Sequence, residues 1–209
     1  MPRIVKKPHE RRKELMEAAL ELFQIHGYHA TSVEMVILKT GVAKGTFYHY
    51  FKSKDEILEA IVQDILSGFI TEARNIATNS SINALKKFEL ILNGQSPSLK
   101  KSGEIMQSLH QSDNRELHEK INVEIVLQLS PILTEVTEQG IRENLFQIDY
   151  VLETIQFLLT GSQFLFNLKE WSVEELVTRS KAMESIVEKS LGAKKGSFKF
   201  LTDKIKMEG

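Results

Sequence analysis

The chain has 209 residues and a mass of 23.9 kDa, enough for one large domain or for a small domain joined to a medium one. Hydrophobic residues make up 42% of it and charged residues 26%, which excludes a disordered or collagen-like chain. The absence of cysteine excludes disulfides, thiolate metal sites and a cysteine nucleophile. No apolar run approaches the roughly 20 residues that cross a bilayer, and the basic start leads into a charged helix, so we expect a cytoplasmic protein with no membrane partner.

The charges are unevenly distributed along the chain, although the net charge is only -1. Residues 1–54 contain ten Lys or Arg and five Glu, a net charge of +5, whereas the remainder carries -6. This split is typical of a basic part that meets a polyanion and an acidic part that does not. A chance cluster of cations between Arg3 and Lys13 would give the same totals.

Apolar residues recur at helical spacing along the whole chain, and no stretch alternates as a strand would. The sequence therefore predicts an all-α protein of about nine helices. The first covers about residues 10–26 and ends at Gly27. Thr31 and Glu34 fit a capping box at the start of a short second helix. After a tight turn at Gly41, a third short helix covers about residues 44–51, which completes a helix-turn-helix pattern.

The rest of the chain predicts six further helices. A capping box over residues 53–56 opens a long helix that reaches about Ala77. Pro131 is expected to kink the longest of the later helices. Residues 192–209 form a lysine-rich tail for which the sequence predicts no structure. The later helices cover about residues 82–92, 104–110, 114–139, 147–168 and 173–191.

The stretch Thr31–Leu58, TSVEMVILKTGVAKGTFYHYFKSKDEIL, resembles the DNA-binding segment of the tetracycline-repressor (TetR) family of bacterial transcriptional regulators. Residues 18–27 resemble the preceding helix of that family. The resemblance is strong over about residues 15–61 and only architectural beyond them. Ile37, Leu38 and Thr40 depart from the family pattern, but these changes concern packing and exposure rather than a base-contacting position.

The resemblance implies two domains. Residues 1–54 form a three-helix DNA-binding domain with a basic arm at 1–13 and the helix-turn-helix motif at about 32–51. Residues 55–209 form a helical effector-binding and dimerisation domain. The implied function is that of a ligand-responsive transcriptional regulator, a repressor released from a pseudo-palindromic operator by a small apolar or amphipathic molecule.

A helix-turn-helix inserts its second helix into the major groove of double-stranded DNA. By resemblance, Lys44, Gly45 and Thr46 face the groove, where Lys44 and Thr46 read bases and Gly45 allows close approach. The other assigned residues approach the phosphate backbone. The aromatic residues Phe47, Tyr50 and Phe51 are expected to belong to the core. The basic arm either adds phosphate contacts or is a solvated terminus, and both interpretations stay open. The residues assigned to DNA are Thr31, Ser32, Lys44, Gly45, Thr46, Tyr48, His49 and Lys54.

One short helix offers too little surface for useful specificity, so a homodimer is expected. The resemblance places the dimer interface on the last two helices, and an intramolecular core is the alternative for the same residues. The assigned interface residues are Val151, Ile155, Leu158, Leu159, Ser162, Phe166, Met183, Ile186 and Val187.

The middle helices resemble the ligand-binding region of the family. The side chains proposed to line a pocket are mostly apolar, which suits an apolar or amphipathic effector, although each also fits an ordinary core position. The proposed pocket residues are Phe69, Met106, Leu109, His110, Ile125 and Phe164.

A helical-bundle enzyme with a dissociable cofactor is the alternative function. The sequence contains no Glu-x-x-His pair, no Gly-x-Ser-x-Gly elbow and no His-Glu-x-x-His motif, so we expect no enzyme, no cofactor and no metal site. His110 and His118 with Glu104 and Glu119 lack a familiar metal-ligand spacing, and a solvated helix face explains them better.

Overall fold

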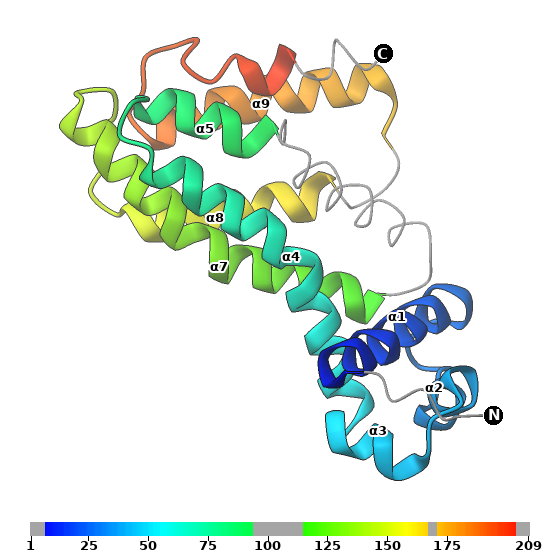
Figure 1. The fold of residues 1–209 in the computed structure, drawn as a ribbon. Coiled ribbons are helices and arrows are strands. Elements are labelled where there is room, and N and C mark those ends of the chain that lie inside the picture. The colour runs from blue at the N-terminus through cyan, green and yellow to red at the C-terminus, as the bar shows by residue number, and fades with distance from the viewer. Residues whose placement is uncertain (1–6, 94–114, 167–170, 204–209) are drawn as a thin grey trace. The chain divides into compact units, whose positions relative to one another are not determined.

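The computed structural model describes residues 7–93, 115–166 and 171–203, whose regular secondary structure consists of helices (Figure 1). No strand occurs within these ranges, so the prediction of an all-α protein is confirmed. The predicted helix at about 104–110 lies outside them. The described helices are α1 (Pro8–His26), α2 (Val33–Thr40), α3 (Lys44–Tyr50), α4 (Lys54–Thr78), α5 (Ala84–Asn93), α7 (Arg115–Arg142), α8 (Val151–Phe166) and α9 (Val173–Ser190).

The chain divides into two compact units. Unit 1 consists of residues 1–67 and 102–121, and unit 2 consists of residues 68–101 and 122–209. Unit 1 thus contains the predicted DNA-binding domain together with the first part of α4. In the described parts of both units, no helix combines the length and the apolar character that a membrane span requires.

The core of unit 1 forms where three short helices bury their apolar faces on one another. α1 packs on α2, and α2 on α3. Phe23, Phe47 and Phe51 are at most 1% exposed, and the ring centroids of Phe47 and Phe51 lie 6.1 Å apart. The core assignment of Phe47 and Phe51 is confirmed. Tyr50, which was expected beside them, is only half-buried and stands at the last position of α3.

Contacts made by the side chains of Tyr28 and Lys54 tie the loop between α1 and α2 to the start of α4. The hydroxyl of Tyr28 donates to a carboxylate oxygen of Asp55 at 2.5 Å. The ammonium of Lys54 donates to the carbonyl oxygens of Tyr28 at 2.7 Å and Thr31 at 2.9 Å, and it lies 4.2 Å from the centroid of the Tyr28 ring. Because these partners are distant in sequence, the contacts fix the beginning of α4 on the helix-turn-helix.

In unit 2, α7 and α9 end in the same way, with a residue in the left-handed conformation. Asn144 follows α7 with φ 57° and Gly192 follows α9 with φ 61°. At the second of these ends, the amide of Ala193 donates to the carbonyl of Glu188 at 2.8 Å, and the amide of Gly192 donates to the carbonyl of Lys189 at 3.3 Å. These two bonds form a Schellman motif, which satisfies carbonyls at the helix end and turns the chain back.

The turn after α9 leads into a segment that packs on the core of unit 2. Phe198 is fully buried, and its ring centroid lies 5.3 Å from that of Phe88 and 6.0 Å from that of Phe146. The rings of Phe88 and Phe146 are themselves 5.8 Å apart. The sequence left the structure of the tail after residue 191 open, and the structure places residues 192–203 against this core. The buried side chain of Phe198, which follows the turn at Gly192, holds this segment on the core. The lysine-rich composition of the tail gave no sign of this contact.

Gly140→Ala is expected to lower the free energy of unfolding by about 1 to 3 kcal/mol. A Cβ atom at position 140 of α7 would overlap the ring of Phe146, which cannot yield because Phe88 and Phe198 pack against it. Urea denaturation followed by circular dichroism measures the change. The matched control is Gly45→Ala, another helical glycine, whose Cβ would meet nothing within 4 Å. Stability of the control should stay equal or rise by up to about 1 kcal/mol; a wild-type midpoint for Gly140→Ala would contradict this packing.

Candidate functional site

The exposed side of α3 carries Lys44 and Tyr48 one helical turn apart. The side chain of Lys44 is 69% exposed and Tyr48 is 44% exposed. The Lys44 ammonium lies 6.0 Å from the centroid of the Tyr48 ring and 3.9 Å from a carboxylate oxygen of Glu34. An ion pair between two such exposed side chains is weak, so the ammonium can exchange this partner for another anion or acceptor. The pair is therefore available to a large polyanionic ligand.

The neighbouring positions of α3 add a small, open surface beside this pair. A Cβ atom at Gly45 would meet nothing within 4 Å, so the backbone there is uncovered. Thr46 is half-buried, and His49 is exposed with its ring centroid 5.0 Å from that of Tyr50. The structure thus brings four of the predicted residues, Lys44, Gly45, Tyr48 and His49, to the surface of one short helix.

The start of α2 differs from the prediction by one residue. Ser32, rather than Thr31, is the N-cap, and its hydroxyl oxygen accepts the amide N–H of Met35 at 3.2 Å. Thr31 is 1% exposed, and its hydroxyl lies 2.8 Å from the carbonyl oxygen of Gly27 and 3.2 Å from that of Leu22. The predicted capping box is therefore wrong: Thr31 faces the protein and closes the turn after α1. Two adjacent hydroxyl residues both suit an N-cap, so the sequence left the register ambiguous.

Lys54 was assigned to DNA by resemblance, and the structure gives its ammonium intramolecular acceptors. Besides the carbonyls of Tyr28 and Thr31, the carbonyl of His29 lies 3.4 Å away. Lys54 thus holds the turn that precedes α2. Its contact with phosphate stays a prediction.

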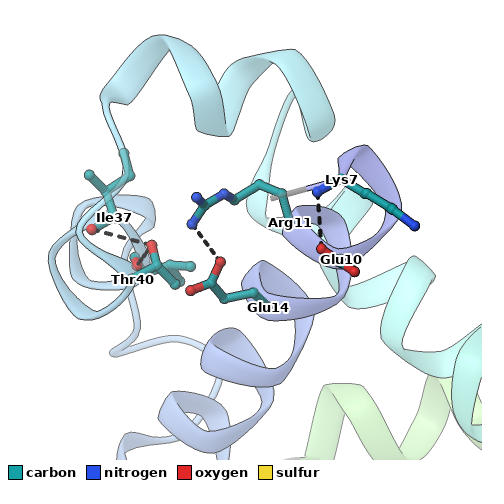
Figure 2. Close-up of polar contacts among 7 residues, drawn as sticks. Lys7, Glu10, Arg11, Glu14, Ile37 and Thr40 are labelled. Atoms are coloured by element: carbon teal, nitrogen blue, oxygen red, sulfur yellow. Dashed lines mark hydrogen bonds and ion pairs between the residues drawn. The ribbon is translucent and has the colours of Figure 1, made fainter. Parts of the chain in front are cut away.

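Part of the predicted basic arm belongs to α1. The helix begins at Pro8, where proline suits the first position, and a carboxylate oxygen of Glu10 accepts the amide N–H of Lys7 at 3.0 Å (Figure 2). Arg11 forms an ion pair with Glu14 at 2.6 Å (Figure 2). Residues 8–13 are therefore helical rather than disordered, although most of them are exposed, and residues 1–6 lie outside the described ranges. Whether the arm contacts phosphate stays open.

The departures from the family pattern in α2 are accommodated locally. The hydroxyl of Thr40 bonds to the carbonyl oxygens of Val36 at 2.8 Å and Ile37 at 3.4 Å (Figure 2). This back-bonding lets a polar side chain replace a smaller residue at the end of the helix. Leu38 is 84% exposed, so its change from a polar residue affects the surface rather than the packing.

Unit 2 contains an apolar cavity of about 510 Å³, a size typical of small-molecule sites. Its walls come from α5, α7, α8, α9 and the segment after α9, and among the described residues none of the lining side chains is ionisable. The hydroxyl of Ser162 donates to the carbonyl of Leu159 at 2.8 Å, which reduces the polarity of the wall further. The lining residues are Phe88, Leu92, Leu133, Ile155, Leu158, Leu159, Ser162, Leu176, Ser180, Met183, Val187, Leu191, Phe198 and Leu201.

None of the described residues that the sequence suggested for a pocket lines this cavity. Phe69 and Ile125 do not line it, and Phe164 is 66% exposed. The other three predicted pocket residues, Met106, Leu109 and His110, lie outside the described ranges. The residues that do form the cavity come from segments far apart in the chain, and no local pattern in the sequence marks their convergence.

Several residues predicted to form the dimer interface instead face the interior of unit 2. Ile155 and Val187 are 2% and 8% exposed in a single chain, so they offer little surface to a partner, and their assignment to an interface stays a prediction. Both line the cavity, as do four other assigned residues, Leu158, Leu159, Ser162 and Met183. Ile186 is 50% exposed and Val151 is half-buried, and the side chain of Phe166 lies outside the described residues.

A different apolar face of α8 and α9 is exposed. Phe157 and Phe164 are 80% and 66% exposed and lie two turns apart on α8, in line with the 75% exposed Tyr150 that precedes the helix. A Cβ atom at Gly161, on the same side of α8, would meet nothing within 4 Å. α9 packs on α8 and adds Ile186. Phe157 was not among the residues predicted for the interface, although aromatic residues at 150, 157 and 164 recur every seven positions.

Comparison with known proteins identifies the family. The chain is 32% identical over 136 residues to the fatty acid metabolism regulator protein of Bacillus subtilis, a match that covers 62% of this chain and 67% of the relative. The chain belongs to the tetR family. The model of the N-terminal region of bacterial regulatory proteins of this family matches residues 15–61, and the model of the tetracyclin repressor-like C-terminal domain matches residues 99–186. Strong resemblance was predicted over the same range, 15–61.

Other relatives of this tetR-family chain are more distant. The transcriptional repressor KstR2 of Mycobacterium tuberculosis is 30% identical over 89 residues, 43% of this chain and 44% of that repressor. Among solved structures, SmeT, the repressor of a multidrug efflux pump of Stenotrophomonas maltophilia, aligns with a TM-score of 0.57 at 18% identity over 89% of this chain and 92% of its own. A TetR/AcrR-family regulator from Thermobifida fusca aligns with a TM-score of 0.55 at 20% identity, covering 87% and 97%. These structures share the fold.

Membership of the tetR family settles the general function. Regulators of this family bind DNA, respond to small-molecule ligands and act as dimers. The protein is therefore a ligand-responsive DNA-binding transcriptional regulator, and the alternative of a helical-bundle enzyme is set aside because the relatives are regulators.

Proposed function

We propose that this regulator is a cytoplasmic homodimeric repressor that reads a pseudo-palindromic operator through α3. In this proposal an apolar or amphipathic molecule in the cavity of unit 2 releases the DNA. The observation that carries it is the exposed Lys44 and Tyr48 pair on a helix whose other face is locked into the core by Phe47. A short helix with a rigid inner face and a free outer face suits insertion into the major groove.

In this proposal the residues of α3 divide between base contacts and phosphate contacts. Lys44 reaches guanine acceptors, because its flexible cation fits their hydrogen-bonding pattern in the groove. Gly45 allows close approach, and Thr46 offers a methyl group to thymine. Tyr48 and His49 contact the phosphate backbone. Ser32, which lies at the start of α2, contacts a phosphate as well.

The effector site is the cavity, because its lining is apolar and large enough for a small molecule. The Bacillus subtilis relative is named as a regulator of fatty acid metabolism, which is consistent with a ligand that carries an alkyl chain. Release requires only that the ligand bind the DNA-free state more tightly than the DNA-bound state. α4, whose residues belong to both units, connects the cavity unit to the DNA-reading unit along the chain.

The DNA-binding part of the proposal is tested by selecting bound fragments from random-sequence duplexes and measuring their affinity at several salt concentrations. If six to ten phosphates are contacted by the dimer, affinity should fall by about 10³ to 10⁵ between roughly 50 and 200 mM salt, because binding releases condensed counterions. Selected fragments should contain two half-sites about 34 to 36 Å apart. A flat salt response would count against binding through the basic face of unit 1.

The effector part is tested by adding medium- and long-chain fatty acids and neutral alkyl compounds to the complex with a selected fragment. Fluorescence anisotropy of the labelled duplex should fall as the ligand releases the protein. Leu176→Trp, which fills the cavity, should abolish this release while keeping DNA affinity, because α9 does not belong to unit 1. Lys86→Trp on the exposed side of α5 is the control and should respond like the wild type. Normal release from Leu176→Trp would exclude this cavity as the effector site.

A further inference from the structure

We infer that residues 191–203, here called the C-terminal strap, form one wall of the effector cavity and set the length of the alkyl chain that the regulator accepts. The inference rests on the proposed function of the cavity as the effector site. The strap lies beyond the match to the C-terminal domain of the family, which ends at residue 186.

The strap is attached to unit 2 by directed bonds rather than by apolar contact alone. After the Schellman turn at Gly192, the amide of Gln147 donates to the carbonyl of Leu191 at 2.9 Å. Two carboxylates of α9 then hold the strap in place. Glu188 accepts the amide N–H of Phe198 at 3.1 Å, and Glu184 accepts the hydroxyl of Thr202 at 2.6 Å. Hydrogen bonds to carboxylates are stronger than bonds between neutral groups, so the position of the strap is well defined.

Three strap residues, Leu191, Phe198 and Leu201, line the cavity. Leu191 and Phe198 are fully buried, and Phe198 is packed between Phe88 and Phe146. Leu201 is only half-buried, so its side chain forms a wall without belonging to the packed core. A substitution of Leu201 by a smaller or larger residue should therefore change the size of the cavity without disturbing the fold.

The chemistry of the lining limits which part of a ligand enters. None of the lining side chains that the structure describes is ionisable, so a charged head group placed against them would have no counter-charge. An uncharged alkyl chain has no such cost. The strap wall then limits how many carbon atoms of that chain fit into the cavity. The ligand class is therefore that of molecules with a straight alkyl chain of limited length.

The test uses straight-chain primary alcohols from hexanol to hexadecanol as probes of the full-length protein. The shift in thermal unfolding midpoint is measured for each alcohol at equal concentration, and the wild type should show one optimal chain length. Leu201→Ala removes three side-chain carbons, so its optimum should be longer by about two to three carbons. Leu201→Trp should move the optimum to shorter chains, and Lys199→Ala, an exposed strap residue outside the lining, should leave it unchanged.

A further variant distinguishes the effect of the lining side chains from the effect of a hydrogen bond that holds the strap in place. Thr202→Val removes the hydrogen bond to Glu184 but keeps the lining side chains, so it should broaden the chain-length optimum rather than move it. An unmoved optimum in both folded Leu201 variants would overturn the inference and leave the cavity as the effector site. If no alcohol shifts the wild-type midpoint, the assignment of the cavity fails and the role of the strap fails with it.

Discussion

Lys44→Ala combined with Tyr48→Ala is expected to abolish specific operator binding while leaving the fold and the dimer intact. Removing one direct interaction in the groove typically costs about 1 to 3 kcal/mol, so the double variant should bind more weakly by up to about 6 kcal/mol per DNA-reading helix. Both side chains are exposed, although the Tyr48 ring also meets the buried Phe47 ring with 5.5 Å between the centroids. Fluorescence anisotropy with a selected duplex measures the change in affinity, and circular dichroism checks the fold.

The two single variants are expected not to add up to the double variant. The Lys44 ammonium lies 6.0 Å from the Tyr48 ring, within the range of a cation–π contact, so each side chain helps to orient the other. Neighbouring residues of this kind usually show a coupling energy in a double-mutant cycle. Lys44→Ala should relax base preference at one position of each half-site, whereas Tyr48→Ala should weaken binding evenly across sequences.

Lys86→Ala in α5 serves as the control for removal of a surface cation, since Lys86 belongs to unit 2 and is about half exposed. Its operator affinity should remain that of the wild type. Unchanged binding by the double variant would show that α3 is not the helix that reads the DNA, even though the protein remains a DNA-binding regulator by family.

Local signals in the sequence predicted unit 1 well. The turn at Gly41 has φ 64°, and the predicted helix at 44–51 differs from α3 by one residue. The hydroxyl of Ser53 accepts the amide N–H of Glu56 at 3.1 Å, as the predicted cap at the start of α4 requires. Such features depend on neighbours a few residues apart, so they can be read without knowledge of the tertiary fold. The error at Thr31 arose within this local range, where two hydroxyl residues compete for one cap.

The site in unit 2 could not be predicted in the same way. Apolar periodicity shows that α8 has apolar side chains on more than one face, but it does not say which face meets the core. Ile155 was predicted at an interface and Phe157 was not, whereas the structure buries Ile155 and exposes Phe157. Burial of Ile155 depends on α5, α7 and the strap, which converge on the cavity from distant parts of the chain.

The exposed aromatic face of α8 leads to the second large effect: Phe157→Glu is expected to convert the dimer into monomers. Burying a phenylalanine side chain contributes about 1.5 to 3 kcal/mol, and a two-fold interface contains each residue twice. Removal of both copies therefore weakens association by about 3 to 6 kcal/mol, before the cost of bringing two carboxylates together is counted. Light scattering across a concentration series measures the molecular mass.

Dissociation should also reduce operator binding, although Phe157 lies in unit 2 and the DNA-reading residues lie in unit 1. A monomer reads one half-site, so the affinity of Phe157→Glu for the full operator should fall to its affinity for a half-site, while the half-site affinity itself stays unchanged. Leu127→Glu is the matched control, because Leu127 is also an exposed apolar residue, 57% exposed, but lies on α7. If the protein stays dimeric with Phe157→Glu and also with Phe157 and Phe164 both changed to Glu, the interface lies on another face. If half-site binding is lost, the chain has misfolded instead.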